Sequence, residues 1–357
     1  MATDFRRTPA LAFFAAAFFT TVSLFICISG AQAQSLQTLA TATDAGRQQR
    51  LIDGAKKEGS LTFYTTTPAE YINLLIDPFE KKYGIKVTIW RARSELILQR
   101  VLNESRAHKA VSDVIASIAP PMEALRRENI LQEVISPYQK DLIPSAAPSH
   151  HQWVSTLQYV FVQAYNTDKI HKADLPKSYT DLLAPKWKGK IGIEGGDHEW
   201  LTSVIQDMGE ENGTKFFNNL TAGNGLSIRV GHPLLTNLVA SGEVPLALTV
   251  YQYSVAQLKA KGAPIDWFVI DRAVTIQDAM AIPKNAPHPN AALLFYDYMI
   301  SPEAQTILAK TIGYVPVNSK VESPLKDVKL KVLDPGVLLD TDEKSFKRFE
   351  TILQLTH

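Results

Sequence analysis

Chemically active side chains are concentrated in residues 194–200, which read Glu-Gly-Gly-Asp-His-Glu-Trp. Carboxylates and an imidazole bind cations and polar solutes, and adjacent glycines let a ligand approach the backbone closely. The segment follows a predicted strand and opens a predicted helix. Asp197, His198 and Trp200 are therefore candidate ligand-binding residues, with the indole as a wall of the site. The simpler interpretation is that Asp197 caps the helix and that His198 is exposed.

Two alternating tyrosines form a second candidate group. Tyr251 and Tyr253 follow an apolar run that ends at Val250, and Gln252 separates them. Phenolate oxygens suit a hard trivalent cation, but metal binding must first deprotonate phenols whose free pKa is about 10. If the ligand is iron, we expect Tyr251, Tyr253, Asp197 and His198 to hold it. Otherwise the tyrosines line a mixed pocket of aromatic and polar groups.

Hydroxyl and charged side chains also follow the predicted strands of the N-terminal half. Hydroxyls and helix N-terminal amides bind anions, and arginine pairs with carboxylate or phosphate, so these positions are candidates as well. Helix capping and solvated arginine are the ordinary alternatives. The candidates are Thr65, Thr66, Thr67, Arg93, Ser94, Glu95 and Ser117.

Patterns typical of hydrolases are missing from the sequence. There is no Gly-x-Ser-x-Gly motif, and the zinc motif His-Glu-x-x-His fails because Thr202 follows His198-Glu199 at its last position. The neighbouring His150 and His151 point to opposite sides of an extended segment, so they do not predict a shared metal. We therefore predict no catalytic site, no cofactor and no enzyme.

The elements that position these residues follow a repeated strand and helix pattern. Strands are predicted at 61–64, 85–90 and 112–117, with helices at 35–58, 69–83, 122–128 and after Ser94, which indicates a parallel sheet covered by helices. A second α/β unit is predicted from about residue 160 to 265, with helices at 176–183, 199–208 and 213–220. Returning strands at 266–270 and 278–282 and helices at 289–299 and 302–309 complete the pattern.

The N-terminal segment has the features of a secretory signal. Arg6 and Arg7 precede an apolar run over residues 10–28, and Ala31-Gln32-Ala33 is a cleavage pattern, so we expect cleavage after Ala33. An uncleaved anchor is the alternative. A lipid anchor on Cys27, the only cysteine, is disfavoured by the bulky residues before it.

Composition limits the partners of the exported chain. Loss of the signal removes Asp4, Arg6 and Arg7 and leaves acidic and basic residues in balance, so no nucleic acid or anionic membrane is expected as a partner. The remaining residues, about 320, exceed the size at which one core usually stops growing, which predicts two lobes. Oligomeric state cannot be read from the sequence.

Several segments, in order along the chain, resemble the ferric-iron-like group of extracellular solute-binding proteins (family 1) of bacterial ABC importers. The resemblance implies a two-lobed periplasmic-binding-protein fold of type II, each lobe a mainly parallel sheet flanked by helices, with a ligand cleft between the lobes. It also implies periplasmic location, delivery to an ABC permease and a monomer. The segments are residues 61–65, 79–87, 113–114, 165–167, 187–192, 241–245, 282–289 and 301–305.

The resemblance leaves the ligand open, because the group is implied to bind ferric iron, phosphonates, thiamine, sugar phosphates or polyamines. Its iron binders carry two adjacent tyrosines; here Tyr253 matches the second, but Gln252 stands at the first. The histidine that some iron binders place after the first strand is replaced by Thr65-Thr66-Thr67. We therefore favour an organic or anionic solute, such as a phosphonate, sugar phosphate or carboxylate, and keep ferric iron as the alternative.

The predicted organisation assigns a signal peptide to residues 1–33 and a discontinuous lobe 1 to 34–158 and 268–320. Lobe 2 takes 159–267, and residues 321–357 form a C-terminal helical segment packed on the lobes. Strands near 155–165 and 265–285 are expected to act as the hinge that closes on the solute. A sensing subunit that reports to a membrane receptor and a secreted hydrolase are the other functions considered.

Overall fold

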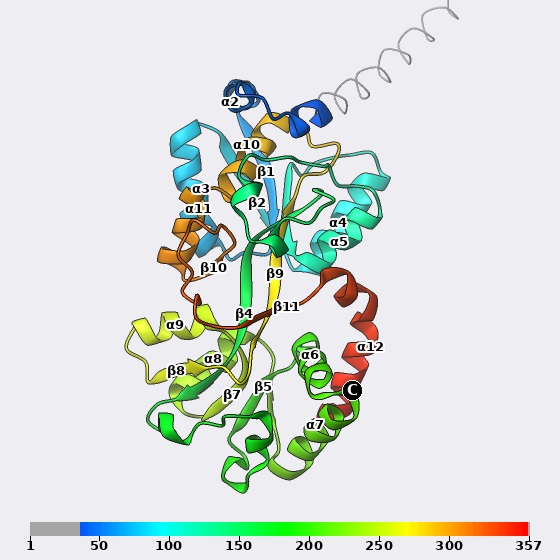
Figure 1. The fold of residues 1–357 in the computed structure, drawn as a ribbon. Coiled ribbons are helices and arrows are strands. Elements are labelled where there is room, and N and C mark those ends of the chain that lie inside the picture. Colours follow the sequence, from blue (N-terminus) through cyan, green and yellow to red (C-terminus); the bar gives the residue numbers. More distant parts are fainter. Residues whose placement is uncertain (1–35, 356–357) are drawn as a thin grey trace, which may run out of the picture.

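The computed structural model describes residues 36–355. The predicted signal peptide lies outside this range. Among the described residues, no helix is both long and apolar enough to cross a membrane. The chain forms two lobes, one above the other, connected by long strands and by the C-terminal helix (Figure 1).

Lobe 1, the upper lobe in Figure 1, is built on three parallel strands in the order β2-β1-β3. Each strand is followed by a helix, as expected for a parallel sheet whose crossovers cover its faces. Helices from the N-terminal part and from residues 289–307 complete the lobe. The elements are α2 (Arg47–Glu58), β1 (Ser60–Thr65), α3 (Ala69–Tyr83), β2 (Lys86–Arg91), α4 (Ser94–Arg106), β3 (Val114–Ile118), α5 (Ala119–Arg127), α10 (Pro289–Met299) and α11 (Pro302–Ile307).

Lobe 2 repeats this design lower in the molecule, with the parallel strands ordered β7-β5-β6. Its strands are buried apart from the short β6, most of β8 and the last residue of β7, Tyr251, and helices pack on both faces. The elements are β5 (Ile191–Glu194), α6 (His198–Met208), α7 (Glu210–Asn224), β6 (Ser227–Arg229), α8 (His232–Ser241), β7 (Leu246–Tyr251), α9 (Gln252–Ala260) and β8 (Ile265–Phe268).

Two antiparallel strands run through both lobes. The upper part of β4 (Val154–Asn166) pairs with β9 (Ala273–Ala281), and its lower part pairs with β7 and β8. Every residue of both strands is buried. The short strands β10 (Val315–Pro316) and β11 (Leu330–Val332) pair with β4 and β9. These strands are the connection about which the lobes can rotate.

Helix α12 (Pro335–Leu353) bridges the lobes on one flank, packing against α5 of lobe 1 and against α6 and α7 of lobe 2. Asp340 on this helix forms an ion pair with Arg127 of α5, and Arg348 pairs with Glu210 of α7. The remaining elements are short 3-10 helices and one π-helical turn. They span Gln139–Asp141, Pro144–Ala146, Lys172–Asp174, Tyr179–Leu183, Pro185–Trp187 and Leu308–Ile312.

Most predicted elements are present, and two helices, α3 and α10, have the predicted bounds. The predicted helix over 35–58 is instead two helical segments, residues 36–41 and α2. Pro120 and Pro121, expected in a loop, lie in the first turn of α5, where the missing amide hydrogens cost nothing. The helix expected over 176–183 is a 3-10 turn. The exact lobe boundaries stay a prediction.

Candidate functional site

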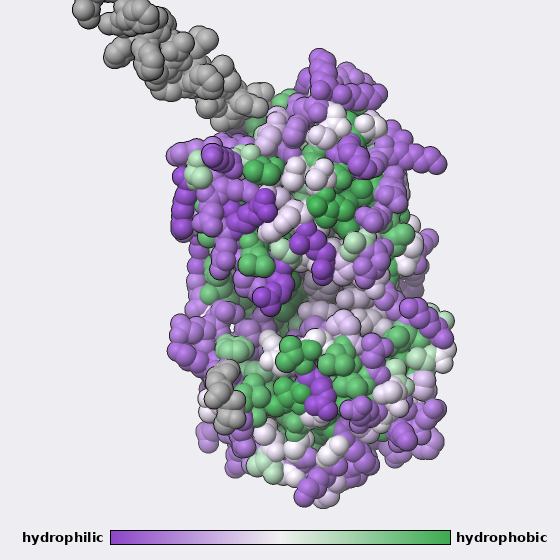
Figure 2. Space-filling model, turned by 180° about the vertical axis from the view of Figure 1, so that it is seen from behind, coloured by the Kyte–Doolittle hydropathy of each residue, from purple (hydrophilic) through white to green (hydrophobic). Residues whose placement is uncertain are grey.

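The carboxyl ends of the parallel strands of both lobes meet where the lobes face each other, the position expected for a ligand of such sheets. A cavity of about 710 Å³ lies there, between the N-terminal turns of α4, α5 and α6 and one face of α12. Seen from the back, the surface of the molecule is hollowed where the lobes meet (Figure 2). We refer to this cavity as the cleft.

The cleft is acidic. No lysine or arginine is found among the described residues that line it, and His198 is the one side chain there that can carry a positive charge near neutral pH. The acidic lining residues come from α4, α6 and α12: Glu95, Glu199, Asp340, Asp342 and Glu343. Asp340 is paired with Arg127 and Asp342 with His198, and the remaining carboxylates give the lining a negative potential that attracts cations and repels anions.

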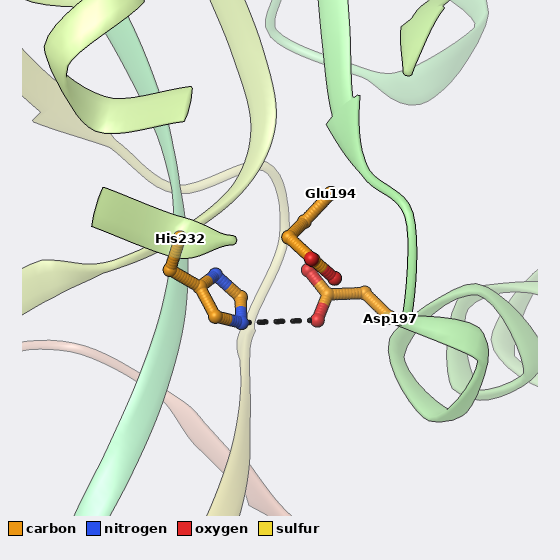
Figure 3. Close-up of side chains that lie close together, drawn as sticks. All are labelled: Glu194, Asp197 and His232. Atoms are coloured by element: carbon orange, nitrogen blue, oxygen red, sulfur yellow. Dashed lines mark ion pairs between the residues drawn. The ribbon is translucent and has the colours of Figure 1, made fainter. Parts of the chain in front are cut away.

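Three side chains from the ends of two neighbouring strands of lobe 2, β5 and β6, converge beside the cleft (Figure 3). Glu194 is the last residue of β5, Asp197 immediately precedes α6, and His232 is the first residue of α8. His232 Nε2 lies 3.2 Å from Asp197 Oδ1, and one potential ligand atom of each side chain lies within 4.8 Å of the others. Gly196, which hydrogen-bonds to Glu194, lines the cleft, so this trio lies directly behind its wall.

Backbone amides fix the orientation of Glu194. One carboxylate oxygen accepts a hydrogen bond of 2.6 Å from the amide of Gly196, and the other accepts one of 2.7 Å from the amide of Gly231. The amide of Glu194 itself donates to the hydroxyl of Thr249. The carboxylate is therefore held in place before any ligand arrives.

Asp197 and His232 each retain an unused polar atom. Within residues 36–355, Asp197 Oδ2 and His232 Nδ1 are buried and have no hydrogen-bond partner. Asp197 stands at the N-cap position of α6, yet its side chain makes no capping hydrogen bond. Burial alone would lower the pKa of His232, but the carboxylates of Asp197, Glu194 and Glu199 outweigh burial and raise it.

Tyr251 packs on this trio. Its ring centroid lies 3.8 Å from that of His232, with the planes inclined by 32°. Burial raises the pKa of the Tyr251 phenol well above its ordinary value, and the negative charges of Asp197, Glu199 and Glu194 raise it further. The phenol is therefore neutral as long as no cation is bound.

A second trio, His198, Glu199 and Asp342, lines the cleft itself and joins lobe 2 to α12. His198 Nε2 lies 2.9 Å from Asp342 Oδ1, and Nδ1 lies 2.8 Å from the carbonyl oxygen of Gly196. Burial raises the pKa of Glu199, and for His198 the nearby carboxylates outweigh burial and raise the pKa. Both imidazole nitrogens of His198 are thus occupied.

Comparison with known proteins decides the family. The sequence model of a bacterial extracellular solute-binding protein family matches residues 75–332. The chain belongs to this family. Its members are solute-binding components of ABC importers, so the predicted resemblance and the two-lobed fold are both confirmed. The similar proteins are periplasmic binding proteins.

Similar solute-binding proteins differ in what they are named for. The major ferric iron-binding protein of Neisseria meningitidis is 26% identical over 281 residues, which cover 74% of this chain and 82% of the relative. A putative 2-aminoethylphosphonate-binding periplasmic protein of Salmonella typhimurium is 25% identical over 257 residues, 69% of this chain and 73% of the relative. Iron-bound HitA from Pseudomonas aeruginosa shares the fold, with a TM-score of 0.71, 23% identity and coverage of 82% and 99%.

The structure of this solute-binding protein brings some predicted residues to the cleft. Ser94, Glu95 and His198 line it, and Asp197 lies behind its wall. Ser117, at the end of β3, is buried, and its hydroxyl has no hydrogen-bond partner within the described range. These positions fit the expectation that strand ends carry the site.

Other residues predicted to bind the ligand make contacts within the fold or lie outside the lining of the cleft. Trp200 is 1% exposed and packs on Tyr179 and Phe217 in the core of lobe 2, so it cannot form a wall of the cleft. The hydroxyl of Thr65 is buried and accepts a hydrogen bond from the amide of Thr67, a local turn contact. The hydroxyl of Thr65 and the amide of Thr67 are thus already hydrogen-bonded to each other. Thr66 is partly exposed, and Arg93 is exposed outside the lining of the cleft.

Tyr251 and Tyr253 belong to an aromatic cluster at the junction of the lobes. Their ring centroids lie 5.9 Å apart with the planes at 19°. Tyr253 also packs on Tyr314 at 4.5 Å and on Tyr71 at 6.4 Å, both of lobe 1. Burial raises the pKa of Tyr253, so this phenol is also neutral in the absence of a cation.

Neither His232 nor Glu194 was among the candidate residues predicted from the sequence. His232 begins a helix that was not predicted, separated by two residues from the end of the three-residue strand β6. Gly231 and His232 connect a strand to a helix, as residues 194–198 do. Pro233, in the first turn of α8, is the sequence feature that could have predicted the start of this helix.

Proposed function

We propose that this protein captures a cationic solute between its lobes in the periplasm and delivers it to an ABC importer. The observation that carries the proposal is the cleft, whose lining combines five carboxylates with no lysine or arginine among the described residues. Each unit charge near a protein surface contributes on the order of a few kcal/mol at contact distance, so the sign of the lining determines the sign of the ligand.

An organic or anionic solute is the main prediction from the sequence, with ferric iron as the alternative, and the electrostatics of the cleft favour a cation. Phosphate and carboxylate ligands are usually held by arginine or lysine through charge-assisted hydrogen bonds. The nearby Arg93 is exposed and is not part of the lining. The meningococcal relative, which is named for ferric iron, supports a cation. The Salmonella relative, which is named for a phosphonate, supports the anionic alternative.

Hinge closure about β4 and β9 is the proposed mechanism, and no chemistry is performed on the solute. Solute binds one lobe of the open form, the lobes rotate together, and the closed form docks on the permease. The protein is proposed to act as a monomer after cleavage behind Ala33. Mass spectrometry of the exported protein tests the cleavage site, and light scattering tests the monomer.

The proposal is tested by thermal unfolding of the metal-stripped chain from Gln34 to His357 with two matched panels. The cations are Zn²⁺, Mn²⁺, ferric citrate, putrescine and spermidine; the anions are phosphate, 2-aminoethylphosphonate and fructose 6-phosphate. A ligand at about 100 times its Kd adds about 2.7 kcal/mol of stability. We expect such a shift with a cation and a smaller radius of gyration in solution scattering. Stabilisation by anions alone, or no stabilisation, overturns the proposal.

A further inference from the structure

We propose that the solute is, or is held through, a divalent first-row metal ion bound by Glu194, Asp197 and His232. This inference rests on the proposed cation-binding function and names the chemical class of the cation. It concerns the trio behind the wall of the cleft (Figure 3) and assigns no ligand role to the two tyrosines expected from the sequence.

The spacing of the trio matches a single coordination sphere. Metal–nitrogen and metal–oxygen bonds are about 2.0–2.2 Å long, so two neighbouring ligand atoms on one ion lie about 2.8–3.6 Å apart in octahedral or tetrahedral geometry. His232 Nε2 and Asp197 Oδ1 are separated by 3.2 Å. A carboxylate oxygen of Glu194 lies within 4.8 Å of both atoms. A small movement of the Glu194 side chain toward them would place all three ligand atoms around one ion.

The unpartnered oxygen of Asp197, Oδ2, independently supports a metal site. Asp197 is 4% exposed, and its Oδ2 has no hydrogen-bond partner within residues 36–355. Leaving a buried polar group without a partner destabilises the folded protein, and more so when the group is charged. Helix capping does not account for this position, because the side chain makes no capping hydrogen bond. A cation held by both carboxylate oxygens of Asp197 would supply the missing partner of Oδ2.

Glu194 is already oriented for such a role. Its two carboxylate oxygens are held by the amides of Gly196 and Gly231. Hydrogen bonds of this kind fix metal-ligating carboxylates in proteins and reduce the entropy lost on binding. Each carboxylate oxygen keeps a second lone pair for a metal.

The charge and the types of the donor atoms select the ion. Two carboxylates with one neutral imidazole carry a charge of −2, which a divalent ion neutralises within a buried site. An imidazole donor favours Zn²⁺ or Fe²⁺ over Mg²⁺, Ca²⁺ and Mn²⁺, which prefer oxygen donors. Tyr251, stacked on His232, shields the site on one side as a neutral phenol.

The second trio is a weaker candidate for the same ion. Both imidazole nitrogens of His198 already have partners, Asp342 and the carbonyl of Gly196. Asp342 has a side chain that is 67% exposed, and it comes from α12, which bridges the lobes. The trio of Glu194, Asp197 and His232 is therefore the better candidate for the ion.

The test uses Co²⁺ as a spectroscopic probe and Zn²⁺ as a competitor on the metal-stripped chain from Gln34 to His357. We expect a saturable visible absorption of bound Co²⁺ that Zn²⁺ displaces. Asp197→Asn and His232→Gln, each close in shape to the original side chain, should weaken Co²⁺ binding by about 100-fold or more. His171→Gln and Asp174→Asn, which change exposed residues of lobe 2 outside the cleft, should leave it within about threefold. Circular dichroism of the metal-free variants establishes that each is folded.

The outcomes separate this inference from the proposed function. If Co²⁺ does not bind, or binds equally well to Asp197→Asn and His232→Gln, the metal site is ruled out. If putrescine or spermidine binds and Asp197→Asn weakens that binding while no metal binds, the cationic solute stands and the metal inference falls. If only the anions of the first panel bind, both are overturned.

Discussion

The phenol of Tyr71 donates a hydrogen bond of 2.9 Å to the side-chain oxygen of Gln257, and this contact joins the two lobes. Tyr71 lies on α3 of lobe 1 and Gln257 on α9 of lobe 2. The amide group of Gln257 in turn donates to the carbonyl of Ile312, again in lobe 1, at 2.8 Å. One glutamine thus connects lobe 2 to two segments of lobe 1, on the flank where the tyrosine cluster lies.

Replacement of Gln257 is expected to favour the open form. Gln257→Ala removes both hydrogen bonds between the lobes, and each contributes about 1 kcal/mol, so the closed form should lose about 2 kcal/mol. That corresponds to a shift of about 30-fold in the equilibrium between closed and open forms and to weaker solute binding by up to the same factor. Solution scattering, with a larger radius of gyration, and calorimetric titration measure the two effects.

The matched control is Gln206→Ala, an exposed glutamine on helix α6 of lobe 2. It changes the same residue type without touching lobe 1. Tyr71→Phe removes one of the two hydrogen bonds and keeps the ring packing, so it should give about half the effect. Equal scattering and equal affinity for Gln257→Ala and the control would contradict the role assigned to this contact.

Local patterns predicted much of the fold because local chemistry sets those elements. Gly84 ends α3 in the left-handed conformation, and the hydroxyl of Ser301 caps α11 by accepting from the amide of Ala304. The elements that were predicted wrongly or missed are those whose structure depends on tertiary packing. The 3-10 turn Tyr179–Leu183 was expected as a helix, and α9 begins one residue after β7 with no turn signal between them.

The candidate site was only half predictable for a related reason. Asp197 and His198 were found because the polar segment after β5 is dense in sequence. His232 was missed because its connection to Asp197 is made in space, across 35 positions of the chain, by two neighbouring strands of one sheet. Trp200 was wrongly predicted to line the ligand site because it was assessed with the loop before α6 and not with the helix. On α6 its side chain points into the core of lobe 2.

Helix α12 offers a test of how firmly the C-terminal segment is attached. Phe349 is fully buried in the core of lobe 2, whereas Phe346, one turn earlier, is 38% exposed beside His198. Phe349→Ala should lower the free energy of unfolding by about 3–5 kcal/mol through loss of buried surface and cavity formation. Phe346→Ala should cost less than about 1 kcal/mol. Urea unfolding of both variants measures the difference, and equal values would contradict the packing of α12 on lobe 2.

The tyrosine that best matches the iron-binding pattern is expected to be dispensable for metal binding. Among the described residues, the ring of Tyr253 contacts the rings of Tyr71, Tyr159, Tyr251 and Tyr314 but not that of His232. We therefore expect Tyr253→Phe to bind Co²⁺ within about threefold of the original chain. Titration with ferric citrate should give no tyrosinate charge-transfer band that depends on Tyr253. A saturable band lost in Tyr253→Phe would instead identify a tyrosinate iron carrier.

The hinge strands carry a buried carboxyl group that should make stability depend on pH. Asp278 on β9 is 2% exposed; one of its oxygens has a single long contact of 3.5 Å from the hydroxyl of Thr156, and the other has no partner within the described range. The titratable groups facing it are the phenols of Tyr159 and Tyr314. Burial raises the pKa of Asp278 to about 7.

The sign of the effect follows from proton linkage. Between the unfolded pKa of about 4 and the folded pKa of about 7, the native protein holds a proton on Asp278 that the unfolded chain has lost, so stability decreases as pH rises through this range. The decrease is at most about 4 kcal/mol. Asp278→Asn cannot ionise, so we expect it to lack this slope and to be more stable than the original chain at about pH 8. Urea midpoints between about pH 5 and pH 8 measure both curves, with Asp77→Asn on the exposed face of α3 as the control. Parallel curves for the original chain and Asp278→Asn would show that this carboxyl group is not buried in its neutral form at the hinge.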